Sequence, residues 1–373
     1  MSTCIEINHP EELESCTLLW RWMLSKTRNA SFFQTLDWLR AYLRHFGDEI
    51  VKLRILIVES GGETLGILPL VIYREKTKVG TIRVLSYPLG DWGTFYGPIG
   101  PNPTATLAVG LAHIRRTRRD WDMIDLRWVD QSGCDHGRTP AALRSNGFQA
   151  TADVWTRVAL IDTSGSWNDY WMGHGDRWRN KVRRSRSKLA ELGQIKFVRY
   201  RPAGLAAGDG DPRWDLYETC TQIAGRSWQG GSVSGTTLSH DSVRPFLRDV
   251  HAAAAKTGHL DLNLLYVDDR PVAFAYNYHR EGSVFGLRMG YDASVSRHGA
   301  GTVLQGSMIQ DSFQRHDPLI NLGAGHLECK RHWLTSVVDS YRYTHFANAA
   351  VRVQALRLKR FMRSLMHRAP QAA

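Results

Sequence analysis

One order of predicted elements occurs twice in this chain, and this repetition restricts the fold more than any other feature. Residues 50–129 and residues 259–323 each predict a β-hairpin, a third strand, a helix and a further strand. Two related α/β domains in tandem follow from this order, each with a right-handed crossover between the strands that flank its helix. The elements of the first copy are predicted at 50–73 (the hairpin), 81–86, 93–98, 104–118 and 121–129.

The length of 373 residues suits two domains of roughly 150 to 200 residues each. Since the first copy ends well before the second begins, we expect the boundary between Ala159 and Trp167. Residues 1–160 are therefore predicted as an N-terminal domain and residues 161–347 as a C-terminal domain. Residues 348–373 are predicted as a basic helix and tail, with peripheral membrane contact as one interpretation of that helix.

The formal charge of +12 at pH 7 indicates an anionic partner, such as nucleic acid, a membrane surface or a phosphate-bearing substrate. No apolar run approaches the roughly 18 residues needed to span a bilayer, and the acidic start does not resemble a signal peptide. Five scattered cysteines without a CxxC pair argue for a reducing compartment and against a thiolate zinc site. The expected location is the cytoplasm.

Much of the positive charge lies on the predicted helix 176–193, DRWRNKVRRSRSKLAELG. Its apolar residues form a narrow stripe, and cations cover the rest of its surface. Helices are also predicted over 213–226, 242–258 and 351–368. The stripe consists of Trp178, Val182, Leu189 and Leu192.

A glycine-rich turn, SRHGAGT at 296–302, stands between the strand at 283–290 and the helix that follows. A helix N-terminus has backbone N–H groups without partners and the positive end of the helix dipole. Glycines let the preceding loop fold tightly, so that these groups converge on phosphate oxygens. The alternative is a turn that only needed small residues. In the first copy, Pro101 and Pro103 stand at the corresponding joint, and proline has no N–H to offer.

This turn, in its setting, resembles the phosphate turn [R/Q]xxGx[G/A] of the GNAT superfamily of acyl-CoA N-acyltransferases. Gly299 and Gly301 match the pattern, while Ser296 departs from its first position. The order of FFQTLDWLRAYLRHFG, SYPLGDWGTFYGPIGP, GRSWQGG, YVDDRPVAFAYNYH and NLGAGHLECKRHWL is similar to the bacterial CelD-like and FemAB-like group with tandem GNAT-like domains. The resemblance covers roughly residues 31–345. It implies two α/β (α+β) domains, each with a mixed, mostly antiparallel sheet flanked by helices.

The resemblance also implies roles for individual residues. Acetyl-CoA or another acyl-CoA is the expected donor, with its thioester beside the strand that ends at Gly290. The first domain is expected to have lost donor binding and to shape the acceptor pocket, or to serve as a scaffold. The residues implied for donor binding are Leu287, Met289, Arg297, His298, Gly299, Ala300, Gly301 and Thr302. Those implied for acceptor binding are Trp92, Arg183, Trp228 and Lys330.

Transfer of an acyl group to an amine needs a base for the amine proton and an acid for the leaving thiolate. Glu328, His326 and Asp91 are the candidate bases, and Tyr291 is a candidate acid. A solvated carboxylate, a helix cap or a core aromatic is an ordinary alternative for each. We expect Asp91 and Glu328 to approach the cleft from opposite sides.

No metal-ligand spacing and no GxSxG motif occur, so no metal and no serine nucleophile are expected. The favoured function is N-acylation of a sugar, peptide, amino acid or cell-envelope precursor, whose anionic or neutral character stays open. A second hypothesis replaces acyl-CoA by aminoacyl-tRNA, as in FemAB-like peptidyl transferases, and only this one needs nucleic acid as substrate. A third is a basic binding protein without catalysis.

Overall fold

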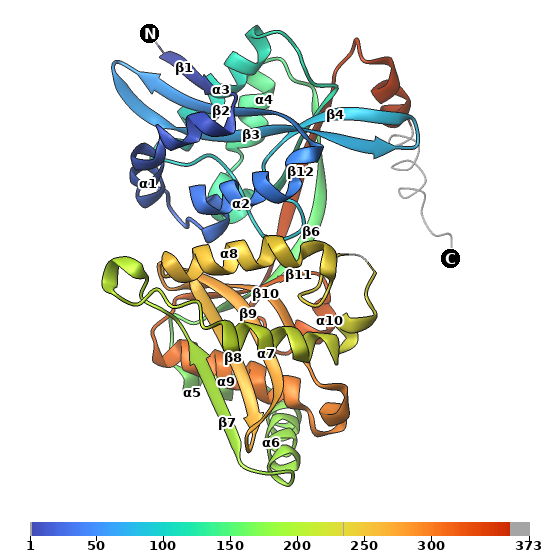
Figure 1. Cartoon of the computed structure of the whole chain (residues 1–373). Helices are drawn as coiled ribbons and strands as arrows, with labels where there is room; N and C mark the ends of the chain where they lie inside the picture. Colours follow the sequence, from blue (N-terminus) through green and yellow to red (C-terminus); the bar gives the residue numbers. More distant parts are fainter. Residues whose placement is uncertain (1, 234, 359–373) are drawn as a thin grey trace, which may run out of the picture.

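The computed structural model describes residues 2–233 and 235–358. Twelve strands of this part of the chain form one mostly antiparallel sheet, in the order β1-β2-β3-β4-β5-β12-β6-β11-β10-β9-β8-β7. The first half of the chain is stacked on the second along this sheet, and helices cover both faces (Figure 1). The fold class is the mixed, mostly antiparallel α/β arrangement that the resemblance implied.

The strands are β1 (Ser2–Ile7), β2 (Ile50–Ser60), β3 (Glu63–Thr77), β4 (Gly80–Ser86), β5 (Met123–Asp130), β6 (Ala150–Asp162), β7 (Ile195–Tyr200), β8 (Leu260–Val267), β9 (Arg270–Arg280), β10 (Ser283–Tyr291), β11 (Leu319–Ala324) and β12 (Ser336–Phe346). The helices are α1 (Thr17–Ser25), α2 (Leu36–Phe46), α3 (Pro103–Arg116), α4 (Arg138–Ser145), α5 (Trp167–Met172), α6 (Asp176–Ala190), α7 (Trp214–Gly225), α8 (Arg244–Lys256), α9 (Ala300–Gln314) and α10 (Leu327–Lys330).

The predicted repetition is confirmed by the elements β2-β3-β4-α3-β5 and β8-β9-β10-α9-β11. In each copy the helix joins two parallel strands, β4 to β5 and β10 to β11, as a crossover must. The strand predicted at 93–98 is wrong. This segment is a loop, because Phe95 has a φ of 47° and Pro98 cannot donate to a ladder, and the isolated bridge between Ile67 and Ile99 comes directly after it.

The two halves of the chain exchange their last strands at the centre of the sheet. β6, which follows the first copy, pairs with β11 of the second, while β12, which follows the second copy, pairs with β5 of the first. β6 and β12 also pair with each other, from Ser336 opposite Leu160 to His345 opposite Ala150. The two expected sheets are therefore joined into one. The boundary at residues 160 and 161 stays a proposal.

Alternation along the strands directs different side chains to the two helical layers. On β9, Phe274, Tyr276 and Tyr278 pack in the core that contains α7 and α8, whereas Ala273 and Ala275 face α9. Small side chains on this second face let α9 lie close to the sheet. The helix N-terminus that follows β10 is thereby held by a buried apolar surface.

The two halves also meet through aromatic side chains. The rings of Phe32 and Tyr278 are tilted against each other with centroids 4.6 Å apart, and the ring of Trp38 in α2 lies 5.4 Å from that of Phe246 in α8. The carboxylate of Asp249 accepts hydrogen bonds from Arg44 and His45 at the rim of this contact. The segment FFQTLDWLRAYLRHFG, which the resemblance singled out, is thus the part of the first half that packs on α8 and β9.

The end of the chain is described only in part. Residues 351–358 are helical, and the rest of the predicted C-terminal helix lies outside the described residues. Within residues 2–233 and 235–358, no helix is both long enough and apolar enough to cross a bilayer.

Candidate active site

Strands β10 and β11 separate soon after they begin to pair. They are hydrogen-bonded as parallel neighbours only at Val284 opposite Ile320 and Phe285 opposite Asn321. Beyond these pairs, β10 shifts register against β9 between Gly286 and Arg288, which makes Leu287 the bulged residue. β11 in turn shifts against β6 after Asn321. We call the resulting gap in the ladder, between residues 286–290 and residues 323–330, the β10–β11 opening.

The glycine turn lies at the end of β10, as predicted. Gly299 has a φ of 71° and caps the N-terminus of α9. Among the described residues, the amides of Ala300, Gly301 and Thr302 have no hydrogen-bond acceptor. Three converging donors at the positive end of a helix dipole suit a phosphate group.

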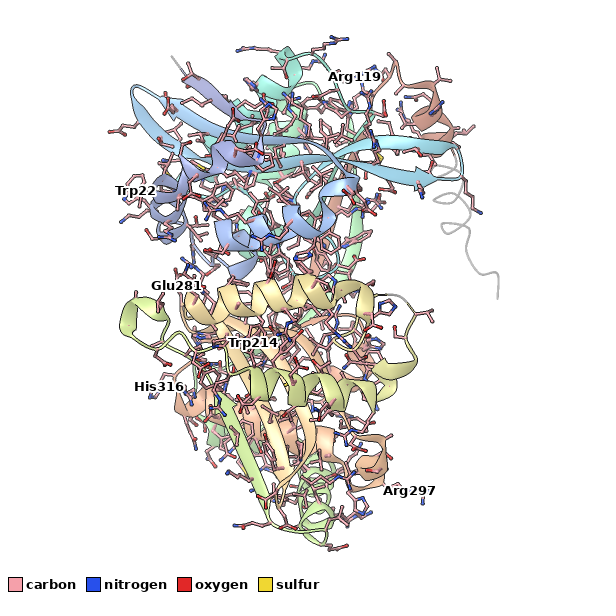
Figure 2. All side chains as sticks on the ribbon, viewed as in Figure 1. Trp22, Arg119, Trp214, Glu281, Arg297 and His316 are labelled. Carbon is pink, nitrogen blue, oxygen red and sulfur yellow. The ribbon has the colours of Figure 1, made fainter. Side chains whose placement is uncertain are left out.

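The side chains around this turn differ in what they can contribute. Arg297 is exposed and forms no ion pair with a described residue, and Figure 2 shows it at the end of the molecule farthest from the first half. The Nδ1 atom of His298 is buried without a partner. Tyr291, the candidate acid, packs its ring against Gly301, since a Cβ atom there would lie 2.9 Å from it. It therefore lies at the turn, within the α9 core.

Residues from two loops meet at the outer end of the β10–β11 opening. The ring of Trp228 lies 6.2 Å from the ring of His326, so the predicted pocket wall and one candidate base are neighbours. Trp228 is 61% exposed, which leaves its face available to a substrate. Glu328 is also exposed and pairs with Arg331 at 3.0 Å. Its carboxylate is thus in solvent.

Lys330 lies on the inner side of the same loop. Its Nζ atom donates to the carbonyl oxygens of Gly323 at 2.9 Å and Ala324 at 3.0 Å, where β11 ends. Burial, with the nearby charge of Arg288, lowers the pKa of Lys330 to about 8. These two carbonyl groups have no β-ladder partner on β10, because β10 and β11 have separated there, and Lys330 supplies their hydrogen-bond donor instead.

The first half reaches the opening through the loop that contains Asp91 and Trp92. The guanidinium of Arg288 stacks on the ring of Trp92 at 4.3 Å, and Thr94 accepts a hydrogen bond from Asn321 of β11. Asp91 is exposed, and its charge acts on Arg288. The loop thus covers the side of β10 that faces the first half. Trp92 is only 5% exposed, so most of its surface is buried in this contact.

Two polar residues of this region, one half-buried and one buried, were not predicted. Arg288 donates to the carbonyl oxygens of Thr236 and Leu287, and burial lowers its pKa to about 10. Gln229 donates to the carbonyl oxygen of Met289 at 3.1 Å and so ties the Trp228 turn to β10. The sequence held one indication of the role of Arg288, since a charged residue stands there between Leu287 and Met289 in an otherwise apolar strand.

Helix α6 packs on α9 beside the glycine turn. Val182 lies near Gly306, and Ser185 lies so close to Gly299 that a Cβ atom there would be 2.6 Å from its hydroxyl oxygen. Leu192, predicted in the apolar stripe, lies beyond the end of the helix and is exposed. Arg183 is exposed as well and contacts Asn180. Thus α6 brings a dense set of cations next to the proposed phosphate site.

The described residues contain no group of three or more His, Cys, Asp or Glu side chains arranged to hold a metal ion. The acyl-transfer chemistry expected here requires positioned amides and a proton acceptor, which the opening and its loops contain.

Residues 176–331 match the family model described as an acetyltransferase (GNAT) domain. No curated protein sequence matches the chain. Among solved structures, the chain is similar to FemX, with a TM-score of 0.62 and 10% identity over 94% of this chain and 98% of FemX. It is also similar to a tandem GNAT protein from the clavulanic acid biosynthesis pathway, with a TM-score of 0.50 and 10% identity over 93% of this chain and 98% of that one. Residues 176–331 are therefore similar to a GNAT domain, and the whole chain has a fold like that of tandem-GNAT proteins, which confirms the predicted resemblance.

Proposed function

We propose that this protein is an N-acyltransferase that transfers an acetyl or longer acyl group from acyl-CoA to an amine. The observation that carries this proposal is the β10–β11 opening, which lies next to a helix N-terminus with three unpaired amides. The match to a GNAT domain over the same residues supports an acyl thioester as the donor. The pyrophosphate would bind the amides of Ala300 to Thr302, with Arg297 beside it.

The reaction then needs little more than alignment. The amine nitrogen attacks the thioester carbonyl carbon, the C–N bond forms, and the C–S bond breaks with sulfur leaving as a thiolate that takes up a proton. Backbone N–H groups at the Leu287 bulge would stabilise the negative oxygen of the intermediate. The amine proton goes to a base, for which Asp91, His326 and Glu328 are the candidates, and Tyr291 stays a candidate acid.

Donor binding is tested by Thr302→Asp. An acidic residue in the first turn of a helix favours the dipole, so the fold should be preserved, yet its charge would repel a pyrophosphate. We expect calorimetric titration to show affinity for CoA weakened by roughly tenfold or more, which is about 1.4 kcal/mol. Gly299 is a poorer choice for this test because any side chain there collides with Ser185.

Gln310→Asp, on an exposed position of the same helix, is the matched control and should leave CoA binding within about twofold of the wild type. Equal affinities for CoA in Thr302→Asp and wild type would contradict phosphate binding at α9.

The base is identified by comparing Asp91→Asn, Glu328→Gln and His326→Gln at saturating donor, with CoA release as the readout. Removal of a true general base slows turnover by roughly 10² to 10⁴-fold. One variant should show such a loss with CoA affinity intact. Near-normal turnover in all three would mean that none of these side chains takes the proton.

Aminoacyl-tRNA is the second candidate donor, because α6 carries seven lysine and arginine side chains and packs beside the glycine turn, and because the fold resembles that of FemX. If tRNA is the donor, the wild type should bind charged tRNA with a steep salt dependence and should show no saturable CoA binding. If the wild type binds CoA and Thr302→Asp weakens that binding, the donor is acyl-CoA.

A further inference from the structure

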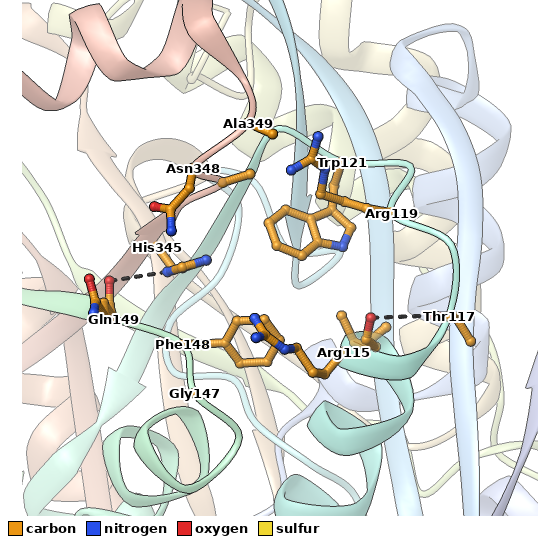
Figure 3. A pocket seen from close by; sticks show the side chains of 12 residues that line it. Arg115, Thr117, Arg119, Trp121, Gly147, Phe148, Gln149, His345, Asn348 and Ala349 are labelled. Atoms are coloured by element: carbon orange, nitrogen blue, oxygen red, sulfur yellow. Dashed lines mark hydrogen bonds between the residues drawn. The ribbon is translucent and has the colours of Figure 1, made fainter.

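A hollow lies where the first half meets the end of β12, and it shares no residue with the β10–β11 opening. It has a volume of about 490 Å³ and lies between the end of α3, the turn before β6 and the end of β12 (Figure 3). Figure 2 shows Arg119, one of its residues, at the opposite end of the molecule from Arg297. A space of this size can hold a small organic ligand.

Two cationic side chains reach this hollow. Arg115 and Arg119 enter it from opposite sides, and His345 and Asn348 lie along a third side (Figure 3). None of the residues that line the hollow is acidic. Neither arginine forms an ion pair with a described carboxylate, although the charge of Arg119 helps to lower the pKa of Asp122, which pairs with Arg83. Two guanidinium groups without carboxylate partners favour an anionic ligand.

The remaining wall is aromatic. Trp121, Phe148 and His345 contact one another with ring centroids 5.2 to 6.1 Å apart. The Arg115 guanidinium lies 5.8 Å from the centre of the Phe148 ring, so that charge and apolar surface adjoin. The Nδ1 atom of His345 must carry a hydrogen, because its partner at 3.1 Å is the carbonyl oxygen of Gln149. Burial lowers the pKa of His345, so the ring is neutral and its Nε2 atom can accept a hydrogen bond from the organic part of a ligand but cannot donate one to a phosphate.

We propose that this hollow binds a small phosphomonoester that has a planar or apolar remainder. The phosphate would lie between Arg115 and Arg119, since a planar guanidinium binds phosphate oxygens in pairs. The remainder would lie against Trp121 and Phe148. The site is independent of the proposed acyl transfer, because no residue is common to both. An extended polyanion fits it less well, since the hollow is bounded on three sides by the chain.

Phenyl phosphate is the probe for this site, with inorganic phosphate and phenol as its separate parts. In calorimetric titrations of the full chain at low salt, phenyl phosphate should bind at least tenfold more tightly than either part. The double variant Arg115→Gln/Arg119→Gln should weaken this binding by at least tenfold. Arg116→Gln/Arg118→Gln, which changes two exposed arginines outside the hollow, is the matched control and should bind within about twofold of the wild type.

The proposal fails if phenyl phosphate shows no saturable binding, if both double variants lose it equally, or if phenol alone binds as tightly. Phosphate alone binding as tightly as phenyl phosphate would also overturn it, because the aromatic wall would then contribute nothing. Thr302→Asp should bind phenyl phosphate like the wild type, so failure at this site and failure at the donor site can be told apart.

Discussion

The Lys330 ammonium group occupies a position that few lysines tolerate, against two carbonyl oxygens and close to a second cation. Burial lowers its pKa to about 8 from an ordinary value of 10.5, and the charge of Arg288 adds to this effect. Hydrogen bonds to Gly323 and Ala324 hold it there. The lysine was expected to bind an acidic substrate group, and the carbonyl bonds give it a second, structural role that the sequence does not show.

This environment predicts a pH-dependent contribution to stability. Between about pH 8 and pH 10 the unfolded chain keeps a proton on Lys330 that the folded chain has lost, so the free energy of unfolding rises with pH there, by at most about 1.4 kcal/mol per pH unit. The cost of burying the charge is fully present below pH 8. Urea unfolding of wild type and Lys330→Met should therefore diverge in favour of the wild type between pH 7.5 and pH 9.5.

Lys188→Met serves as the control, since Lys188 is exposed on α6, and its difference from the wild type should stay constant over the same range. A constant difference for Lys330→Met as well would show that the ammonium group is not buried as described.

Single residues also mark the limit of prediction from this sequence. The glycine turn could be found because the backbone at Gly299 has a φ of 71°, and this local requirement for glycine is visible in the sequence. Arg288 could not be placed, because its position depends on a bulge and on Trp92, nearly two hundred residues away. Contacts between distant segments have no local pattern in a single sequence.

Helix α6 has two basic flanks on either side of its packed face, and their neighbours differ. Lys181 lies over Trp178, which stacks on His332 just after α10, so that this flank faces the β10–β11 opening. On the other flank Arg179 contacts Met172 of α5. The flank toward α10 consists of Arg177, Lys181, Arg184 and Lys188. The flank toward α5 consists of Arg179, Arg183 and Arg186.

Charge reversal separates the two flanks. Lys181→Glu/Arg184→Glu should raise the KM of the donor by roughly tenfold at low salt, and the effect should shrink as salt screens the charges. Arg183→Glu/Arg186→Glu changes the same net charge and should leave donor KM within about twofold. If Arg183 instead contacts an anionic acceptor, the second variant will raise the acceptor KM alone. Equal effects of both variants on donor KM would mean that only the net charge of α6 matters.

The loop of residues 87–98 shows why element type was harder to predict than element order. Its aromatic residues favour a strand, yet Phe95 takes a left-handed conformation. The loop then places Trp92 under Arg288 and Thr94 against Asn321. Tertiary contacts with the second half outweigh the local preference. From the sequence, Asp91 of this loop was expected to approach the cleft and Trp92 to bind the acceptor, and both roles stay predictions.

The two halves are joined more completely than their sequence repetition suggests. Hairpins and crossovers are local, so their order could be predicted from periodicity alone. The exchange of β6 and β12 depends on pairing between strands that lie nearly two hundred residues apart, for which a single sequence gives no evidence. Because of this exchange, neither half can keep its last strand paired if the other unfolds. We therefore expect one cooperative transition for the whole chain.

Leu304 and Phe246 test this cooperativity. Leu304 is buried between α9 and the sheet of the second half, whereas Phe246 of α8 contacts Trp38 and Phe46 of α2 in the first half. Truncating either to alanine should destabilise the protein by about 3 to 5 kcal/mol. If the sheet unfolds as one unit, Leu304→Ala will reduce hydrogen-exchange protection equally in β2–β3 and in β8–β9, and calorimetry will show a single shifted transition, as with Phe246→Ala. If the halves unfold independently, Leu304→Ala will lower hydrogen-exchange protection in β8–β9 alone, and calorimetry will show a first-half transition at its wild-type temperature. That result would rule out cooperative unfolding of the sheet.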